Sequence, residues 1–600
     1  METVKPSRYS QLYRGHLLIV LCGALATGAI SCGPRAASPP SDTAQTDQMV
    51  RALADTVVAD VFEQRPELPT MLRPPGARYD SLPDDSLNGI AARDAQRAQW
   101  LQRLHSIDVG QVRSPEARLA YQLARARLAD GQALQICHYE LWTVSQMLNG
   151  WQVRFANLAQ IQPVGTEELR AQALRRFGAL PDYIDTQTTN LREGLRRGYR
   201  AADINVRAVI DQLDQLVATP PDRSPFFDPA QRDGDPTFRS QFAELVGTCL
   251  QPAIRRHRDF LRTEYLPQAR SVVGVSSNPD GAACYRASLR YATTLDIEPE
   301  AIQALGVSQL ASVEAEMRAI STQSFGSAPV PELLRRFKDD AVYRYRDGAQ
   351  MIALAQSSMD RAWAALPTVF GMLPTAPAVV EPIPAFQERT AAPHYLAAAL
   401  DGSRPAAYRI RLYHPQEQSM VAGEATAFHE VVPGHHLQIN IANNRAALPT
   451  IARFLSNSGF SEGWGLYAER LAEEMGLYSN AADRFGMLST FSWRAVRMIV
   501  DTGIHAKGWT RQQAIDKLLA HTALSPDQAA AEIDRYIAWP GQAPSYMLGY
   551  LEIRRLRDEA QRALGKTFDL RAFHDRVLED GSVTLPMLQE RIAAWLEKAE

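Results

Sequence analysis

Residues 585–598 read LPMLQERIAAWLEK, and this stretch shows the pattern that decides the fold. Leu588, Ile592 and Trp595 recur every three or four positions, so they fall on one stripe of an α-helix. The same periodicity runs through most of the chain, most clearly in residues 95–130, 165–217, 296–322, 331–366 and 552–564. The sequence therefore predicts a mostly α-helical protein.

Strand signals are few and lie together. Residues 378–384 (AVVEPIP) are apolar and bounded by prolines, and residues 408–413 (YRIRLY) alternate with period two. We expect a small β element there, close to the active site. An exposed strand edge at 408–413 could hold a peptide in extended form through backbone hydrogen bonds.

The chain has 600 residues, which is more than one hydrophobic core usually supports. We expect a large, bilobed helical domain with a deep cleft. The predicted parts are an N-terminal helical lobe at 47–270 and a catalytic region at 271–600. The formal net charge of −3 comes without a basic stripe, so a nucleic-acid partner is not expected.

The N-terminus has the features of an export signal. Lys5, Arg8 and Arg14 precede a short apolar run that ends in small residues, and the run is too short for a typical membrane span. Ala29-Ile-Ser-Cys32 resembles a bacterial lipobox, which implies cleavage after residue 31 and lipidation of Cys32. Residues 32–46 are then a flexible tether. Gly33 resembles an outer-membrane sorting signal, so we expect a lipid-anchored envelope protein that faces the periplasm.

Three further cysteines follow the lipobox. A Cys249–Cys284 disulfide could form in an oxidising compartment, and buried free thiols explain the same residues equally well. Cys137 is the third. Because no C-x-x-C pair exists, a cysteine-rich metal site is not expected.

Histidines gather in residues 429–438, which read HEVVPGHHLQ. Strict H-E-x-x-H, with both histidines on one helix face, is absent because Pro433 stands where the second histidine belongs. On an unbroken helix His436 shares the face of His429, whereas His435 points about 120° away. A break at Pro433 and Gly434 would bring His435 there instead. Spacing alone leaves the choice between them open.

A third ligand is available about thirty residues later. Residues 459–470 also read as a helix, with Glu462 and Glu469 seven positions apart on one face. A His₂Glu set holds one catalytic Zn²⁺ and leaves a position for water. Glu430, next to His429, would take a proton from that water as the general base.

The strings HEVVPGHHLQ and SEGWGLYAE resemble the bacterial domain of unknown function 885. Further similar blocks are ACYRASLRYATTLDIEPEAIQALG, LPTVFGMLPTAPAVVEPIP, RAVRMIVDTGIHAKGWT, WPGQAPSYMLGYLEI and FDLRAFHDRVLEDGSVTLPMLQERI. Together they cover roughly residues 50–600. The resemblance implies a gluzincin-like zinc peptidase with His435 rather than His436 as ligand. It also implies an all-α fold like the helical carboxypeptidases and oligopeptidases, with a deep cleft.

Several other residues are candidates for supporting roles. Tyr546 and His505 could stabilise the oxyanion of a tetrahedral intermediate. Asp501, one helical turn before His505, could orient it or a ligand histidine. Gln438 and Glu469 are expected in the shell around the ligands.

The substrate class follows from location and charge. An exported domain on a tether would meet peptide fragments, and a narrow channel would exclude folded proteins. Arg494 and Arg497 could bind a peptide carboxylate bidentately. We therefore expect a carboxypeptidase-like exopeptidase that acts on short peptides.

Two other functions compete with this interpretation. Residues 459–463 (GFSEG) match the nucleophile elbow of serine hydrolases at Ser461, with Asp501 and His574 downstream, but that motif requires a preceding strand. The other alternative is a non-catalytic envelope lipoprotein with a structural metal site. The presence of Glu430 argues against it, since holding metal does not require this residue.

Overall fold

The computed structural model describes residues 42–384, 388 and 392–598. The predicted signal peptide, Cys32 and most of the predicted tether lie outside the described residues. From Asp42 onward the chain forms one compact unit.

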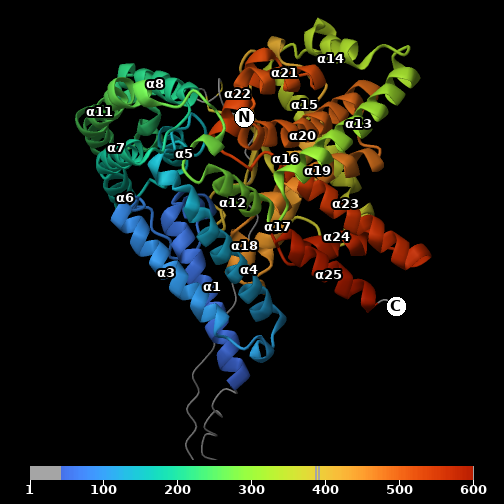
Figure 1. Ribbon diagram of the computed structural model, residues 1–600, viewed down its shortest axis with the longest axis horizontal. Helices are drawn as coiled ribbons and strands as arrows, with labels where there is room; N and C mark the ends of the chain where they lie inside the picture. The colour runs from blue at the N-terminus through green and yellow to red at the C-terminus, as the bar shows by residue number, and fades with distance from the viewer. Residues whose placement is uncertain (1–41, 385–387, 389–391, 599–600) are drawn as a thin grey trace, which may run out of the picture. The chain divides into compact units, whose positions relative to one another are not determined.

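Helices make up most of the described chain (Figure 1). The first half contains α1 Asp42–Gln64, α2 Glu67–Leu72, α3 Leu87–His105, α4 Pro115–Leu134, α5 Trp151–Ile161, α6 Glu167–Gly178, α7 Leu180–Arg197, α8 Asp203–Ala218, α9 Asp228–Arg232, α10 Pro236–Glu244, α11 Gln251–Phe260 and α12 Gly281–Thr293. The second half contains α13 Pro299–Ser324, α14 Val330–Asp339, α15 Gly348–Ala365, α16 Gly423–Glu430, α17 His435–Asn444, α18 Thr450–Phe454, α19 Ser458–Glu474, α20 Ala481–Lys507, α21 Arg511–His521, α22 Pro526–Ala538, α23 Ser545–Leu564, α24 Leu570–Leu578 and α25 Leu585–Glu597.

The prediction of a mostly helical fold is confirmed, and the periodic stretches divide into separate helices. Residues 165–217 form α6, α7 and most of α8. The helix α7 ends at Gly198, whose φ of 88° is a left-handed conformation that glycine adopts without strain. Residues 331–366 divide into α14 and α15, where Asp347 caps the second helix by accepting a hydrogen bond from the amide of Gln350.

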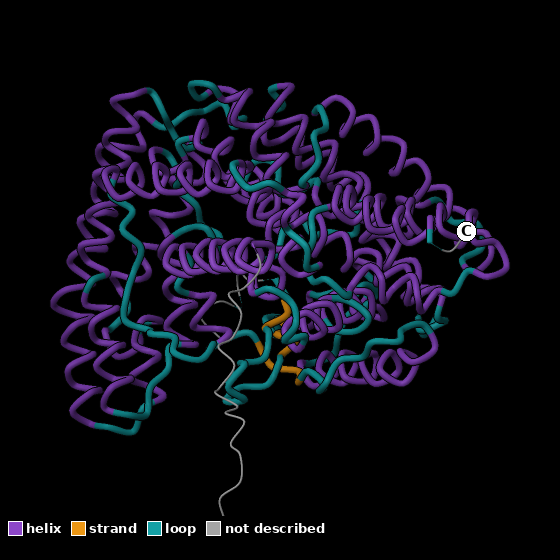
Figure 2. Tube along the Cα trace, turned by 90° about the horizontal axis from the view of Figure 1, so that it is seen from below, coloured by secondary structure: helices purple, strands orange, loops and turns teal. Residues whose placement is uncertain are grey.

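The predicted β element is present as a three-stranded sheet with the order β1-β3-β2 (Figure 2). Strand β1 spans Val379–Pro382, β2 spans His394–Leu396 and β3 spans Ala407–Ile410. β3 pairs in parallel with β1 and antiparallel with β2. The strand predicted at 408–413 is therefore the central one, with both edges occupied. It cannot offer a free edge to a peptide, which corrects that expectation.

The buried cores cross the expected boundary at residue 270. One core combines apolar residues of α1, α3 and α4 with residues of the C-terminal helices, and another lies wholly between Val144 and Tyr265. Helices α1 and α4 both pack on α18. The buried cores do not decide the division into 47–270 and 271–600, which stays a prediction.

The helices that carry the histidine motif lie together. α16 packs on α15, α19 and α20, α20 packs along α13, and α19 packs along α23 (Figure 1). Gly463 and Gly549 allow the close approach of α19 and α23, because a methyl group at Gly463 would lie 2.5 Å from the Gly549 backbone. The site is thus built on rigid, buried helices.

The disulfide in the structure differs from the Cys249–Cys284 pair considered from the sequence. Cys284 forms a disulfide with Cys137, 147 positions earlier, and Cys249 is a free, exposed thiol. The link ties α12 to the turn that follows α4. Among the described residues, no helix is both long and apolar enough to cross a membrane.

Candidate metal centre

The helical conformation is interrupted between the two helices that carry the histidines. α16 ends at Glu430, one residue after His429, and α17 begins at His435. The break predicted at Pro433 and Gly434 is therefore present. Glycine is required at 434, because a methyl group there would lie 1.9 Å from the carbonyl oxygen of His429. The indole of Trp464 donates a hydrogen bond to the Pro433 carbonyl at 2.9 Å and fixes this turn.

The turn brings three potential ligands together. Nε2 of His429 and Nε2 of His435 each lie 3.5 Å from Oε2 of Glu462. Ligand atoms of the three residues all lie within 4.8 Å of one another. Four tetrahedral donors at about 2.1 Å from a zinc ion are about 3.4 Å apart, so this donor set fits a zinc ion in chemistry, and the two separations from Glu462 also fit it in spacing.

His436 has a different environment, although it is only one residue further on. Its Nδ1 accepts a hydrogen bond from the Tyr395 hydroxyl at 3.1 Å, and its Nε2 donates to the Ala376 carbonyl at 2.7 Å. Both ring nitrogens are therefore engaged between the sheet region and α17. The structure groups His435, not His436, with His429 and Glu462.

His429 is oriented by a second carboxylate. Its Nδ1 donates to Oε1 of Glu469 at 2.9 Å, and the Thr490 hydroxyl donates to the other oxygen of that carboxylate. A carboxylate on the far nitrogen fixes the tautomer and leaves Nε2 as a lone-pair donor. The helix α19 thus supplies Glu462 to one ring nitrogen of His429 and Glu469, two turns later, to the other.

Gly465 lies between those two glutamates and makes room for the imidazole. A methyl group at position 465 would lie 2.6 Å from Cε1 and Nε2 of His429. Sequence reasoning missed the roles of Gly465 and Thr490. The glycine could have been suspected from its place between Glu462 and Glu469, but nothing in the sequence points to Thr490.

Charge is concentrated at the three potential ligands, the triad of His429, His435 and Glu462. Burial alone would lower the pKa of His429, but hydrogen bonds with Glu462 and Glu469 raise this pKa to about 9. Burial would likewise raise the pKa of Glu462, but His429 and His435 outweigh it and hold that pKa well below its usual range. A metal ion would therefore compete with protons for these ligands.

Glu430 is held beside the sheet. Its Oε2 accepts a hydrogen bond from the backbone amide of Tyr395, in strand β2, at 2.9 Å. The carboxylate is half-buried, in contrast to the fully buried Glu424 earlier on α16. Tyr395 thus connects the two histidine-bearing helices, since its amide holds Glu430 and its hydroxyl holds His436. The sequence did not single it out.

Tyr546 and the two arginines lie together near His429. The Tyr546 ring is inclined by 26° to the His429 ring, with centroids 6.4 Å apart. The guanidinium carbons of Arg497 and Arg494 lie 4.4 and 5.7 Å from the Tyr546 centroid. The structure thus brings Tyr546, Arg494 and Arg497 into one group beside the triad.

His505 and Asp501 do not have the environments expected of them. His505 is fully buried, its Nδ1 accepts from the amide of Val275 at 3.0 Å, and its Nε2 donates to the carbonyl of Tyr536 at 3.0 Å. Burial lowers its pKa to about 3, so the ring is neutral and has no proton left for a substrate. Asp501 accepts from the Tyr285 hydroxyl at 2.6 Å and orients no histidine. Both predicted roles are corrected to structural ones.

The serine-hydrolase motif lacks its required context. Ser461 lies inside α19, and the short helix α18, not a strand, precedes it. Its hydroxyl accepts a hydrogen bond from Nε2 of Gln438 at 3.4 Å. His574 is engaged with the Tyr467 hydroxyl and the Val369 carbonyl. Gln438 thus contacts the residue next to Glu462, and its role in the ligand shell stays a prediction.

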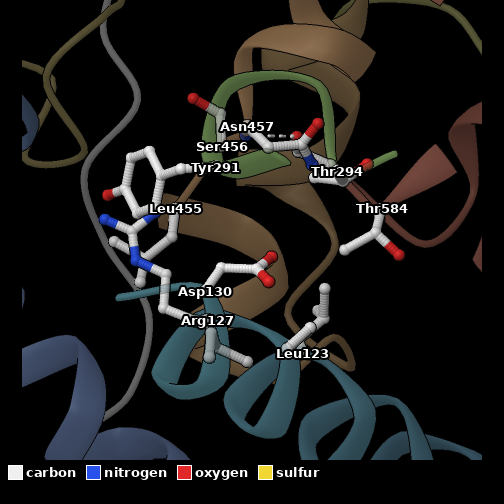
Figure 3. A pocket seen from close by; sticks show the side chains of 12 residues that line it. Leu123, Arg127, Asp130, Tyr291, Thr294, Leu455, Ser456, Asn457 and Thr584 are labelled. Atoms are coloured by element: carbon white, nitrogen blue, oxygen red, sulfur yellow. Dashed lines mark hydrogen bonds between the residues drawn. The ribbon is translucent and has the colours of Figure 1, made fainter. Parts of the chain in front are cut away.

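One surface pocket lies elsewhere. In Figure 3 the side chains of Leu123, Arg127 and Asp130 on α4 surround it together with residues such as Asn457 and Thr584. None of its lining residues belongs to the His429–His435–Glu462 triad. The deep cleft expected above the triad stays a prediction.

Fold and site together define a helical protein with a partly buried His₂Glu donor set, in which His429 lies near the end of α16, His435 begins α17 and Glu462 lies on α19. The chain belongs to the family of bacterial proteins of unknown function DUF885, which matches residues 66–592. No curated protein sequence matches it.

Two solved structures are similar to the chain. One is a protein provisionally assigned as a lipoprotein in Colwellia psychrerythraea, with 25% identity and a TM-score of 0.85 over 92% of this chain and 99% of that one. The other, from Shewanella oneidensis, is provisionally assigned as a lipoprotein of unknown function. It has 16% identity and a TM-score of 0.69 over 91% of this chain and 99% of its own, which shows the fold alone.

Proposed function

We propose that this protein is a zinc-dependent hydrolase that cleaves peptide bonds of short peptides as a carboxypeptidase-like exopeptidase. The observation that carries the proposal is the triad, in which Nε2 of His429 and of His435 each lie 3.5 Å from Oε2 of Glu462. These three residues would hold one Zn²⁺. Three protein ligands leave a coordination position for water, as catalytic zinc sites do and closed structural sites do not.

The bound ion would lower the pKa of a water molecule and polarise the substrate carbonyl. Glu430 follows His429 directly in the chain and is the general base of the proposal. The Tyr395 amide holds its Oε2, so Oε1 is the atom that takes the proton. Glu430 would then pass that proton to the leaving amine.

Tyr546 is the proposed donor to the carbonyl oxygen. Burial raises the pKa of its phenol, and the negative charge of Glu462 acts in the same direction, so the hydroxyl keeps its proton at neutral pH. A neutral phenol fixed beside His429 can donate a hydrogen bond as negative charge develops on the substrate oxygen.

An envelope location is part of the proposal. The solved relatives from Colwellia and Shewanella are provisionally assigned as lipoproteins, and the motif at Ala29–Cys32 fits the same export route. We propose that the protein is attached to the outer membrane through Cys32 and faces the periplasm. There it would meet short peptides.

The decisive comparison is between Glu430→Gln and Ser461→Ala. The mature domain is purified, its zinc content is measured, and it is incubated with a mixture of short peptides. Glu430→Gln should keep about one zinc per chain and lose most activity, because the base is absent while the ligands remain. Ser461→Ala should retain activity.

A chelator should stop cleavage, and zinc should restore it. Loss of activity in Ser461→Ala but not in Glu430→Gln would reject the proposal in favour of a serine hydrolase. Bound zinc without cleavage of any peptide would identify a structural metal site in a non-catalytic lipoprotein.

A further inference from the structure

One face of α20 points at the candidate metal centre. Thr490 donates its hydroxyl to Glu469, the carboxylate that orients His429. Arg494 and Arg497 follow Thr490 at intervals of four and three residues, so they continue the same helix face over the next two turns. Arg494 is therefore just over one turn, about 6 Å along the helix axis, beyond the residue that supports the ligand shell.

Arg494 lacks the partners that a buried guanidinium normally has. No described residue accepts a hydrogen bond from it, although its Nε and Nη1 are buried. Its guanidinium lies 4.5 Å from the Trp493 ring and 5.7 Å from the Tyr546 ring, which hold it in place by stacking. Buried donors without acceptors are costly, so their presence in a rigid site indicates a missing anionic or polar partner.

Arg497 provides an internal comparison three residues away. Its Nε donates to the Tyr536 hydroxyl at 2.7 Å, and its Nη2 donates to Glu532 at 3.0 Å. Its guanidinium lies against the Tyr546 ring at 4.4 Å. Arg497 is thus engaged through two of its nitrogens and positions Tyr546, although its Nη1 has no partner, whereas no nitrogen of Arg494 donates to a described residue.

The charges around Arg494 do not balance. Glu532 is the carboxylate that pairs with both Arg497 and Arg535. Arg494 therefore adds a third positive charge beside Glu532, and the other nearby carboxylate, Glu469, already accepts hydrogen bonds from His429 and Thr490. Burial and the neighbouring charge of Arg497 lower the pKa of Arg494, as expected for a cation without its counter-ion. An incoming carboxylate would supply that counter-ion.

We propose that Arg494 binds the free C-terminal carboxylate of the peptide substrate through its planar guanidinium, so that the protein acts on peptides with an unblocked C-terminus. This inference rests on the proposed function and deepens it. Tyr546 lies between Arg494 and the triad, with its ring 6.4 Å from that of His429. Arg494 lies 5.7 Å from the same ring, and an extended peptide spans about 3.5 Å per residue, so a carboxylate on Arg494 places a bond within about three residues of the C-terminus at the triad.

The test uses one N-acetylated tripeptide in two forms, the free acid and the C-terminal amide, with the zinc-loaded protein. We expect wild-type kcat/KM to be about 100-fold higher for the acid, the size expected for a charge-assisted hydrogen-bonded pair. Arg494→Met should lower kcat/KM for the acid about 100-fold and leave that for the amide within about twofold. Arg494→Lys keeps the charge and should recover part of the preference.

Arg484→Met is the matched control, since Arg484 lies on the same helix with 44% of its side chain exposed and pairs with Glu473. Thermal unfolding of each variant shows whether it is folded. Equal wild-type cleavage of acid and amide would overturn the assignment of Arg494 together with the carboxypeptidase-like part of the proposed function. An unchanged preference in a folded Arg494→Met protein would overturn the assignment of Arg494 alone. Either result leaves the zinc-dependent hydrolase standing.

A binding measurement separates the two proposals further. Calorimetry with Glu430→Gln protein should show the acid binding about 10- to 100-fold more tightly than the amide, and adding Arg494→Met should remove the difference. This binding preference, combined with zinc-loaded wild-type protein that cleaves neither peptide, would support the carboxylate site while rejecting the hydrolase. Equal binding of acid and amide would reject the carboxylate site.

Discussion

Replacing Gly465 with alanine tests whether the position of His429 governs the proposed metal site. A methyl group at 465 would lie 2.6 Å from Nε2 and Cε1 of the ring, whereas ordinary contacts begin near 3.4 Å. The ring must therefore move by about 0.8 Å, several times the roughly 0.2 Å tolerance of a metal–ligand distance. Glu469 resists the movement, because its 2.9 Å hydrogen bond holds the opposite nitrogen.

We expect Gly465→Ala to lower zinc affinity at least about 10- to 100-fold, the range seen when ligand orientation is lost. Overpacking should also cost about 1–3 kcal/mol of stability. This cost is partly offset by about 1 kcal/mol, because alanine favours the helix. Zinc affinity is measured by competition with a chromogenic chelator, and stability by urea unfolding of metal-free protein.

Gly131→Ala on α4 is the control, since a methyl group there meets nothing within 4 Å. It should leave zinc binding unchanged and stabilise the protein by up to about 1 kcal/mol. Wild-type zinc affinity in Gly465→Ala would refute the idea that Gly465 sets the ring position. It would also show that His429 is free to move within the site.

Three further predictions follow from individual contacts. Glu469→Gln should weaken zinc binding about 10- to 100-fold in the same chelator assay, because the His429 tautomer is no longer fixed by a charge; unchanged affinity would show that Glu469 is dispensable. Tyr546→Phe should reduce kcat about 10²- to 10³-fold on a short peptide with zinc content unchanged, unless the hydroxyl takes no part in stabilising the oxyanion. Burial raises the pKa of Asp501 to about 7, so its contribution to stability is lost as pH rises from about 4 to about 7. Asn does not titrate. The free energy of unfolding of Asp501→Asn, relative to wild type, should therefore rise by on the order of 4 kcal/mol between pH 4 and pH 8, as measured by urea unfolding. A difference that does not change with pH would contradict the shifted pKa.

Much of the candidate site could be predicted from local sequence. His429, Glu430 and Glu462 lie in two short strings whose helical periodicity is visible without a structure. The choice between His435 and His436 could not be made from spacing, because the geometry of the break at Pro433 and Gly434 decides it. The structure groups His435 with the other two because Tyr395 and Ala376 engage both nitrogens of His436.

Roles that were predicted only from the distance between residues along a helix were wrong. Asp501 and His505 lie one turn apart, which suggested that one orients the other. In the structure the partners of His505 are Val275 and Tyr536, far away in sequence. Similarly, Cys284 pairs with Cys137 rather than Cys249, because loop closure over 147 residues depends on how α12 packs and not on spacing.

The sequence by itself determined the helical class, the small β element and the two strings that carry the donor set, because periodicity and residue chemistry are local properties. Only the tertiary structure decided which side chains became partners. Thr490 and Gly465 support His429, and Tyr395 holds Glu430, from three separate elements. Arg494 remains without an acceptor among the described residues, while Arg497 is paired. These differences depend on the rotation and separation of packed helices, which no single segment specifies.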